Sequence, residues 1–334
     1  MAEIGDIPAT MRAAVYTERG PAAQVLRVVE IPVPEPGPGD VLVRVRWSGV
    51  NPTDWKARAG SGPLDLAYQV PDQDGAGDVV AVGAGVDPGR VGERVWVYHA
   101  ADLRPHGTAA QYTVVPTEQA VRLPETTTYE QGAALGIPYI TAHHCLFGDG
   151  PVDGWTVLVT GGAGAVGCAA VQLASWGGAA RVLATVSSPE KGEIATASGA
   201  DTVLLYREPG FRDALAAAAP EGVHRVVDVA LGANLDADLS VLRRGGTIVT
   251  YASESADPVV PTRRLMTENV TLRFVLVYTL APSQIAHAVR DITSALEGGA
   301  LRELPRHVFT LDEVAAAHDA VEAGAVGKVL IRVD

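Results

Sequence analysis

The sequence predicts an α/β protein of two domains, a barrel-like β domain and a doubly wound domain built on a parallel sheet. The chain has 334 residues, more than one hydrophobic core usually organises, and 47% of them are hydrophobic, enough for two cores. The first third reads as short strands between Gly and Pro residues, which favours a barrel. The middle alternates short apolar runs with Ala-rich segments, as βαβ units do.

The β domain is expected to begin at Met11, after a loose lead-in of residues 1–10. Residues 41–47 alternate apolar with charged side chains, which is the pattern of a half-buried strand. They follow a Pro- and Gly-rich turn at residues 32–40. Further strands are expected at residues 78–83, 94–98 and 110–115.

The doubly wound domain is expected over residues 136–279, with strands at residues 157–160, 182–186, 202–205, 225–229 and 247–250. In the tail, a helical repeat of apolar positions predicts an amphipathic helix through Ile285, Val289, Ile292 and Leu296. A second helix is expected near residues 314–323 and a strand at residues 328–333. We assign this tail to the first domain, which then comprises residues 11–135 and 280–334.

The composition disfavours several classes of partner. A formal net charge of −13 repels phosphate backbones and anionic lipid, so nucleic-acid and membrane binding are not expected. No apolar run reaches about 18 residues, and no charged-then-apolar leader opens the chain. The two cysteines, Cys145 and Cys168, have no metal-type spacing and fit a reducing cytoplasm. An anionic cofactor would therefore need a locally positive pocket.

A glycine-rich segment follows the strand expected at residues 157–160. Gly161, Gly164 and Gly167 have the spacing GxxGxxG, and a helix over residues 168–176 comes next. Glycines in this context let the backbone approach a pyrophosphate, whose charge is stabilised by the N–H groups and dipole of the helix N-terminus. The alternative is a tight turn that packs a helix on a strand without a ligand. Because further βαβ units follow, we predict a dinucleotide-binding loop.

The end of the second strand of that domain indicates which dinucleotide is bound. NAD selectivity usually comes from an Asp or Glu there, and the sequence has Ser187 and Ser188 instead. Pro189 marks the first turn of the next helix, Ser188 is its expected N-cap, and Lys191 falls in the first turn. A phosphate held by these groups favours NADPH over NADH. In the alternative, Lys191 is a solvated residue paired with Glu190 or Glu193.

Several motifs in combination resemble the zinc-free quinone oxidoreductase (ζ-crystallin-like) branch of the medium-chain dehydrogenase/reductase superfamily, from Met11 to Val333. The matching segments are residues 48–54, 74–77, 92–95, 136–142, the glycine loop, 199–201 and 327–329. The resemblance implies a GroES-like β-barrel domain joined to a Rossmann domain, with the cofactor in the cleft between them. It also implies a homodimer or tetramer formed by extending the Rossmann sheet, for which residues 271–278 would supply the edge strand.

The resemblance also implies roles for individual residues. Lys191 and Tyr206 match contacts to the cofactor 2′-phosphate, and Lys328 of the closing motif is assigned to cofactor binding. Positions near the nicotinamide and pyrophosphate are matched by Asn51, Thr141, Ala165 and Val166, of which Asn51 and Thr141 are the catalytic candidates.

The sequence departs from the family at two places. The usual Pro-Gly-x-Asp reads Pro71-Asp72-Gln73-Asp74, and Trp55 precedes Lys56 where tyrosine is common. Both departures concern the expected substrate pocket rather than the fold.

The positions of the catalytic zinc ligands in related alcohol dehydrogenases correspond to Asn51, Gln73 and Ile137. None of these is a thiolate or imidazole ligand, and two cysteines could not build the four-cysteine structural lobe. Without a Lewis acid to stabilise an alkoxide, an acceptor that already takes hydride readily is the easier substrate. Quinones and conjugated enones are such acceptors.

Other side chains have alternatives that stay open. Asn51 could donate its amide to a substrate carbonyl or the nicotinamide ribose, or form an Asx-type turn with Pro52. Asp54 is expected to support this loop. Tyr139 could face the site or pack. His143 and His144 point to different sides of a helix, so they cannot chelate one metal together. His99 and His106 could donate a proton near neutral pH.

The first hypothesis is an NADPH-dependent quinone oxidoreductase. The alternative with the same fold and cofactor is an NADPH-dependent enone or alkenal double-bond reductase. An alternative of another class is a non-catalytic, crystallin-like nucleotide-binding protein.

Overall fold

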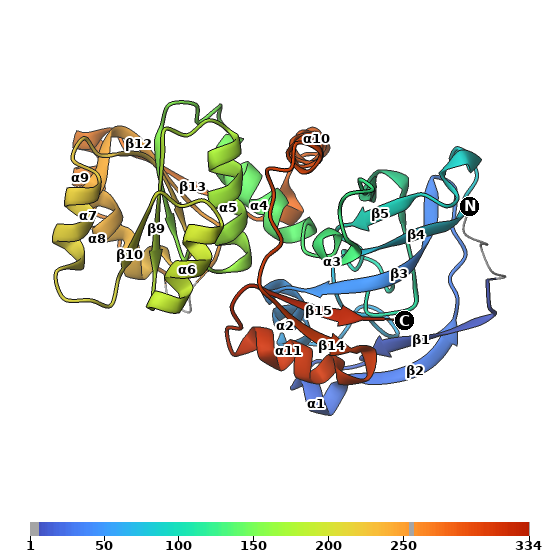
Figure 1. Ribbon diagram of the computed structural model, residues 1–334. Coiled ribbons are helices and arrows are strands. Elements are labelled where there is room, and N and C mark those ends of the chain that lie inside the picture. Colours follow the sequence, from blue (N-terminus) through green and yellow to red (C-terminus); the bar gives the residue numbers. More distant parts are fainter. Residues whose placement is uncertain (1–6, 254–256, 334) are drawn as a thin grey trace. The chain divides into compact units, whose positions relative to one another are not determined.

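The computed structural model describes residues 7–253 and 257–333, and contacts divide the chain into two compact units (Figure 1). Unit 1 contains the residues up to Ile137 and those from Leu304 onward, and unit 2 is Pro138–Glu303. A β-rich unit and an α/β unit with a parallel sheet confirm the predicted fold class. The first six residues of the predicted lead-in lie outside the described residues.

Unit 1 is built on a seven-stranded sheet. Its order is β14 (Arg306–Thr310), β15 (Lys328–Arg332), β3 (Asp40–Val50), β4 (Asp74–Val82), β5 (Arg94–Val97) and β7 (Ala120–Arg122), with β6 (Tyr112–Pro116) also paired to β3. The two remaining strands, β1 (Thr10–Val15) and β2 (Arg27–Pro32), pair antiparallel. These pairings form an open path rather than a closed ring among the described strands. The helices of this unit are α1 (Ala22–Val25), α2 (Pro52–Ala59), α3 (Tyr129–Gly132) and α11 (Val314–Glu322).

The strand β3 organises this unit because it pairs with three neighbours, β15, β4 and β6. Its apolar residues Val41, Val43 and Val45 are almost fully buried, as the alternating pattern predicts. Three strands of this unit, β2, β7 and β14, were not predicted from the sequence. β2 has no buried residue, and β7 has only three residues, so neither shows a clear apolar period.

Unit 2 contains six parallel strands. Their order is β10 (Thr202–Leu205), β9 (Arg181–Val186), β8 (Thr156–Thr160), β11 (Val223–Asp228), β12 (Leu242–Thr250) and β13 (Thr271–Phe274). The helices are α4 (Gly136–Phe147), which begins two residues before the unit, α5 (Ala165–Trp176), α6 (Pro189–Ala197), α7 (Phe211–Ala218), α8 (Leu231–Val241), α9 (Thr262–Glu268) and α10 (Pro282–Glu297). The strand order reverses at β8, with β9 and β10 on one side of it and β11, β12 and β13 on the other. This is the doubly wound topology, in which ligands bind at the carboxyl ends of the strands.

Short 3₁₀ turns connect these elements at Pro88–Arg90, Thr117–Gln119, Val277–Thr279 and Leu311–Glu313. The helix pairs α5 with α6 and α7 with α8 pack together beside the parallel sheet (Figure 1). Apolar side chains from β8, β9, β11 and β12 fill the core between sheet and helices. None of the described helices has the length and apolar character needed to cross a membrane.

The helix predicted through Ile285 and Leu296 is α10, but its neighbours differ from our assignment. Contacts group residues up to Glu303 with the parallel sheet, whereas we assigned everything from residue 280 to the first domain. Ile292 and Leu296 are buried, and Asp291 bonds to His143 of α4. An amphipathic stripe predicts that one face is buried but not which element covers it.

The predicted dimer-edge segment lies at one end of the six-stranded sheet. Within it, β13 ends at Phe274, and the chain then turns into the 3₁₀ segment Val277–Thr279. Phe274 is 68% exposed, so the described residues leave its side chain at this edge largely uncovered. The dimer remains a prediction.

Candidate cofactor and active site

The glycine loop of unit 2 follows β8 directly and leads into α5. Gly161 has φ +67°, a left-handed conformation that favours glycine, and Gly164 is the exposed residue immediately before the helix. A Cβ on Gly167 would lie 2.2 Å from the carbonyl oxygen of Gly161. The third glycine therefore allows the helix to approach the loop, which is the packing role that the spacing predicts.

The start of α5 offers backbone donors at the carboxyl edge of the sheet. Ala165, Val166 and Gly167 form the first turn, whose N–H groups have no acceptor within a helix. The partial positive charge of the helix terminus adds to these donors. The loop and helix start can thus hold a pyrophosphate, with Gly164 open to the ligand.

Backbone hydrogen bonds bring the predicted 2′-phosphate residues to the same edge. The Gly162 N–H donates to the Thr185 oxygen at 3.1 Å, and the Tyr206 N–H donates to the Val186 oxygen at 3.0 Å. Ser187 follows directly, so the loop, the end of β9 and Tyr206 are neighbours. Tyr206 is 46% exposed, and its hydroxyl can reach a ligand from this edge.

Ser188 is the N-cap of α6, as predicted, and its hydroxyl accepts from the Lys191 N–H at 3.5 Å. Pro189 is the first residue of the helix. Lys191 forms no ion pair among the described residues with either neighbouring glutamate, which leaves its ammonium available to a phosphate. Glu190 is an unfavourable neighbour for a phosphate because its carboxylate is negatively charged. A hydrogen bond from the Ser188 side chain lowers the pKa of this carboxyl and so favours the charged form.

Two residues at this edge, Arg207 and Asp228, were not predicted from the sequence. Arg207 is exposed, and its guanidinium lies 5.9 Å from the Tyr206 ring centroid, so a second cation stands beside the predicted phosphate contacts. Asp228 ends β11 and accepts from the Thr160 hydroxyl at 2.8 Å and the Asn234 amide at 2.7 Å. An acid directly after a buried apolar run was the available signal for Asp228.

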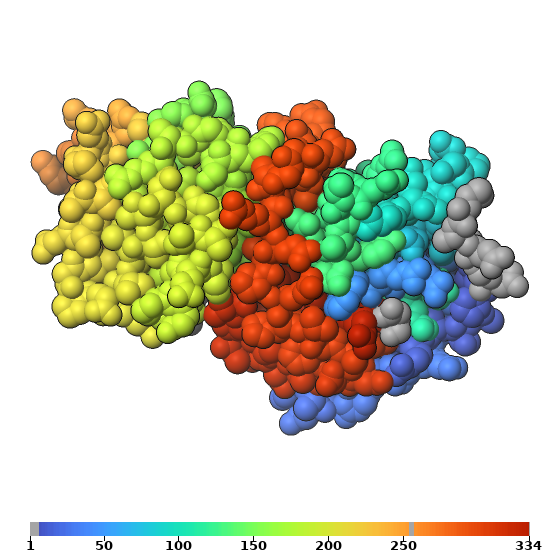
Figure 2. Space-filling view, in the orientation of Figure 1, coloured from blue at the N-terminus to red at the C-terminus, as the bar shows by residue number. Residues whose placement is uncertain are grey.

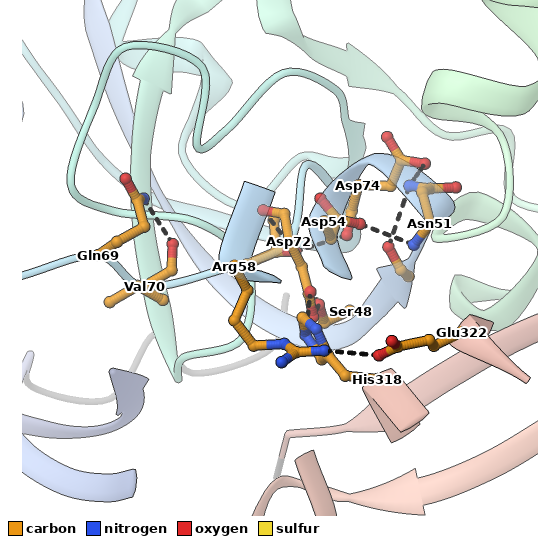
Figure 3. A network of polar contacts seen from close by, with 12 residues as sticks. Ser48, Asn51, Asp54, Arg58, Gln69, Val70, Asp72, Asp74, His318 and Glu322 are labelled. Carbon is orange, nitrogen blue, oxygen red and sulfur yellow. Dashed lines mark hydrogen bonds and ion pairs between the residues drawn. The ribbon is translucent and has the colours of Figure 1, made fainter. Parts of the chain in front are cut away.

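In unit 1, Asn51 contacts the buried carboxylate of Asp74 (Figure 3), and the Lys328 ammonium reaches the same carboxylate. The Asn51 amide donates to Asp74 Oδ2 at 2.7 Å and to the Gly49 oxygen at 3.3 Å. The Lys328 ammonium donates to Asn51 Oδ1 at 2.6 Å and to Asp74 Oδ2 at 3.3 Å. Lys328 is only 2% exposed, so its ammonium serves this cluster.

These bonds limit what Asn51 can do. Both hydrogens of its amide are used within the protein, and its oxygen already accepts from Lys328. Its backbone N–H donates to Asp54 Oδ2 at 2.7 Å just before α2 begins at Pro52. The observed contacts of the Asn51 side chain are structural, but they go to Gly49, Asp74 and Lys328 rather than forming the expected Asx-type turn with Pro52.

Asp54 is buried beside two other carboxylates. Burial, followed by the charges of Asp72 and Asp74, raises its pKa well above the ordinary value. Its Oδ1 has no hydrogen-bond partner among the described residues, while Oδ2 accepts from Asn51. A protonated carboxyl removes the cost of a third buried charge. Asp54 supports the loop, as expected.

Asp72 replaces the glycine of the family motif, and the backbone shows why glycine is usual there. Its φ is +75°, in the left-handed region that Asp tolerates better than most residues. Ser48 donates to its Oδ2 at 2.8 Å, and His318 Nε2 lies 3.0 Å from its Oδ1 (Figure 3). All three side chains are fully or almost fully buried. These buried contacts hold the strained residue in place.

The three positions that correspond to zinc ligands do not fit a zinc ion. The Asn51 amide is committed to Asp74, and Gln73 Oε1 accepts from the Ala101 N–H at 3.1 Å. Ile137 contributes only its backbone N–H, which donates to Asp74 Oδ1 at 2.9 Å. A zinc site needs thiolate, imidazole or carboxylate ligands, and none stands at these positions.

The remaining candidates are less favoured as proton donors. Burial and the nearby Arg104 lower the pKa of His99 to about 4, and burial lowers the pKa of His106. The His99 imidazole is therefore neutral at pH 7, and burial favours the neutral form of His106. Tyr139 is buried and its hydroxyl donates to Gln172 Oε1 at 3.4 Å, which is the packing alternative. Thr141 is 5% exposed on α4.

Comparison with known proteins identifies both parts of the chain. Residues 37–125 match the family model of the alcohol dehydrogenase GroES-like domain, and residues 165–294 match that of zinc-binding dehydrogenases. A quinone oxidoreductase from Sus scrofa is 31% identical over 322 residues, which is 95% of this chain and 96% of that protein.

Solved structures agree over nearly the whole chain. A mycobacterial protein complexed with NADPH is 31% identical, with a TM-score of 0.84 and coverage of 97% of this chain and 100% of that one. An NAD-dependent alcohol dehydrogenase is 28% identical, with a TM-score of 0.86 and the same coverage.

The raised pKa of Asp54 predicts a pH-dependent cost. A carboxyl whose folded-state pKa exceeds its unfolded value contributes most stability at low pH and loses it as pH rises through the folded-state pKa. Asp54→Asn keeps an acceptor for the Asn51 N–H and cannot ionise. We therefore expect wild type to lose more unfolding free energy than Asp54→Asn between about pH 5 and about pH 8, measured by urea unfolding. Asp65→Asn, at an exposed position in the same unit, is the control and should follow wild type. Parallel pH profiles for all three proteins would show that Asp54 carries no such penalty.

Proposed function

The chain belongs to the quinone oxidoreductase branch of the medium-chain dehydrogenase/reductase superfamily, and from this premise we propose that it uses NADPH to reduce a quinone without a metal ion. It is an oxidoreductase that binds a nicotinamide cofactor and acts on a small molecule. The choice of NADPH, the quinone and the absence of metal are the proposed parts.

The choice of cofactor rests on the residues that follow β9. No acid follows this strand to bind a ribose 2′-hydroxyl, and two serine hydroxyls stand there with Lys191 and Tyr206. The NADPH complex of the mycobacterial protein supports this choice. The similar NAD-dependent alcohol dehydrogenase and the nearby Glu190 make NADH the competing cofactor.

When bound, the cofactor supplies the hydride from its nicotinamide ring. The loop at Gly161–Gly167 and the first turn of α5 would hold its pyrophosphate, and Ser187, Ser188, Lys191 and Tyr206 its 2′-phosphate. Thr141 is proposed near the nicotinamide. Asn51 is proposed to hold the loop before α2 through its bonds to Asp74 and Lys328 rather than to transfer a proton. Protons for the reduced quinone would come from water or a weak donor.

A quinone is favoured because the side chains at the zinc-ligand positions offer no Lewis acid. Oxidation of an alcohol requires stabilisation of the developing alkoxide, whereas a quinone accepts hydride without it. An enone or alkenal is the second candidate, since it shares this property. The shape of the substrate site would decide between the two.

The deciding experiment is NADPH oxidation at 340 nm by the purified enzyme, with a para-quinone and an α,β-unsaturated ketone in parallel. We expect quinone turnover to exceed enone turnover at least about tenfold, a difference of about 1.4 kcal/mol in activation free energy. Dominant enone turnover would make the protein a double-bond reductase. Tight NADPH binding without turnover of either acceptor would leave the non-catalytic, crystallin-like alternative.

Lys191→Ala tests the cofactor assignment. Loss of a charge-assisted hydrogen bond to phosphate should raise the Kd for NADPH by about 10- to 100-fold and leave the Kd for NADH within about twofold. Arg122→Ala, at an exposed basic residue of unit 1, is the matched control and should change neither constant. Both constants can be measured by cofactor fluorescence titration. Equal losses for the two cofactors would remove the 2′-phosphate role.

The metal-free proposal predicts the response to chelators. After exhaustive dialysis against a chelator, kcat and KM for the quinone should remain within about twofold of the untreated enzyme, because no metal takes part in hydride transfer. Steady-state kinetics with and without added Zn²⁺ measure this. Loss of turnover that zinc restores would overturn the proposal.

A further inference from the structure

Three side chains of types that bind metal ions converge in unit 2. His143 lies on α4, and His287 and Asp291 lie on α10. His143 Nε2 is 2.8 Å from Asp291 Oδ2, and His287 Nε2 is 3.2 Å from the same oxygen. The three ligand atoms lie within 4.8 Å of one another.

The helices explain this convergence. His287 and Asp291 are four residues apart, so they occupy the same face of α10 and lie one turn apart. The buried residues Ala288 and Ile292 pack α10 into unit 2, which brings that face to His143. The two imidazole rings are edge-on, with centroids 5.1 Å apart. Two of the ligands therefore come from a short-range spacing within α10, and the third comes from a long-range contact with α4.

The spacing of the ligand atoms suits a small divalent ion. Zinc binds imidazole nitrogen and carboxylate oxygen at about 2.0–2.2 Å, so neighbouring atoms of a tetrahedral site lie about 3.3 Å apart. The two observed nitrogen–oxygen distances, 2.8 and 3.2 Å, are close to that value. An ion would replace the hydrogen bond that joins His143 to Asp291.

We propose that His143, His287 and Asp291 bind Zn²⁺, or a divalent transition ion of similar ligand preference, and thereby link α4 to α10. The His287 side chain is 49% exposed and that of Asp291 is 26% exposed, so an ion can enter from solvent and keep a water as its fourth ligand. In Figure 2, the part of the chain that contains α10 is coloured orange-red and reaches the visible surface.

This site is distinct from the zinc-ligand positions of related alcohol dehydrogenases, which lie in unit 1 and do not fit the ion. The ion would stabilise unit 2 and would not take part in hydride transfer. Without it, the same residues form a hydrogen-bonded triad in which Asp291 Oδ2 is close to both histidines. Metal titration separates the two arrangements.

The test uses tag-free, chelator-treated protein, because an affinity tag of histidines would bind the ion itself. Titration calorimetry with Zn²⁺ should give one ion per chain with a Kd below about 10 μM. At about 100 times the Kd, the apparent Tm should rise by about 5 °C, since an ion that binds only the folded state stabilises it.

The variants are His287→Ala and Asp291→Asn, at the two more exposed ligands, so that the fold is retained. Each should weaken zinc binding at least about 30-fold and abolish the Tm rise, while His307→Ala, at an exposed histidine of unit 1, should behave as wild type. Co²⁺ gives a second readout, because a tetrahedral site yields visible absorption that the variants should lose. Failure of wild type to bind, or equal binding by His287→Ala, would overturn the proposal. Neither result depends on turnover of a quinone.

Discussion

The buried carboxylate of Asp74 connects three distant segments of unit 1. It accepts from the Asn51 amide at the start of α2, from the Lys328 ammonium on β15 and from the Ile137 N–H at the start of α4. Burial raises the pKa of this carboxyl, and the Lys328 charge, the largest opposing influence, lowers it. A buried charge is tolerated only where such donors compensate for lost water. The conformation around the candidate active site therefore depends on this one group.

Packing around Asp74 also restricts the backbone beside it. A Cβ on Gly136 would lie 2.0 Å from Asp74 Oδ1, so the residue before Ile137 must be glycine for the donor to come this close. On the preceding side, Asp72 keeps its left-handed conformation through Ser48 and His318. The segment 71–74 is thus held from both sides by hydrogen bonds to residues far apart in sequence.

Local features of the site were predictable from sequence, and long-range ones were not. The loop at Gly161–Gly167 and the Ser188 cap depend on residues within one strand–helix connection, where spacing and residue type determine the geometry. The bond between Lys328 and Asn51 joins residues 277 positions apart, so no periodicity or spacing reveals it. The same reasoning applies to α10, whose apolar stripe was clear although its partner was not. In the same way, no sequence pattern in this strongly acidic chain indicates that Lys328 is buried.

The Asp74 cluster also concerns the metal-free reaction that we propose, in a superfamily whose alcohol dehydrogenases use zinc. At the positions of the metal ligands, the chain has an amide and a backbone N–H that bond to Asp74, and a glutamine that bonds to Ala101. These bonds hold the loops in place, which a metal does elsewhere, but they provide no Lewis acid. Holding the loops in position and activating a substrate as an electrophile are therefore two separate functions. In the reaction that we propose, the acceptor's own electronic structure would therefore have to take up the hydride, and a quinone meets that requirement because hydride and a proton convert it to an aromatic hydroquinone.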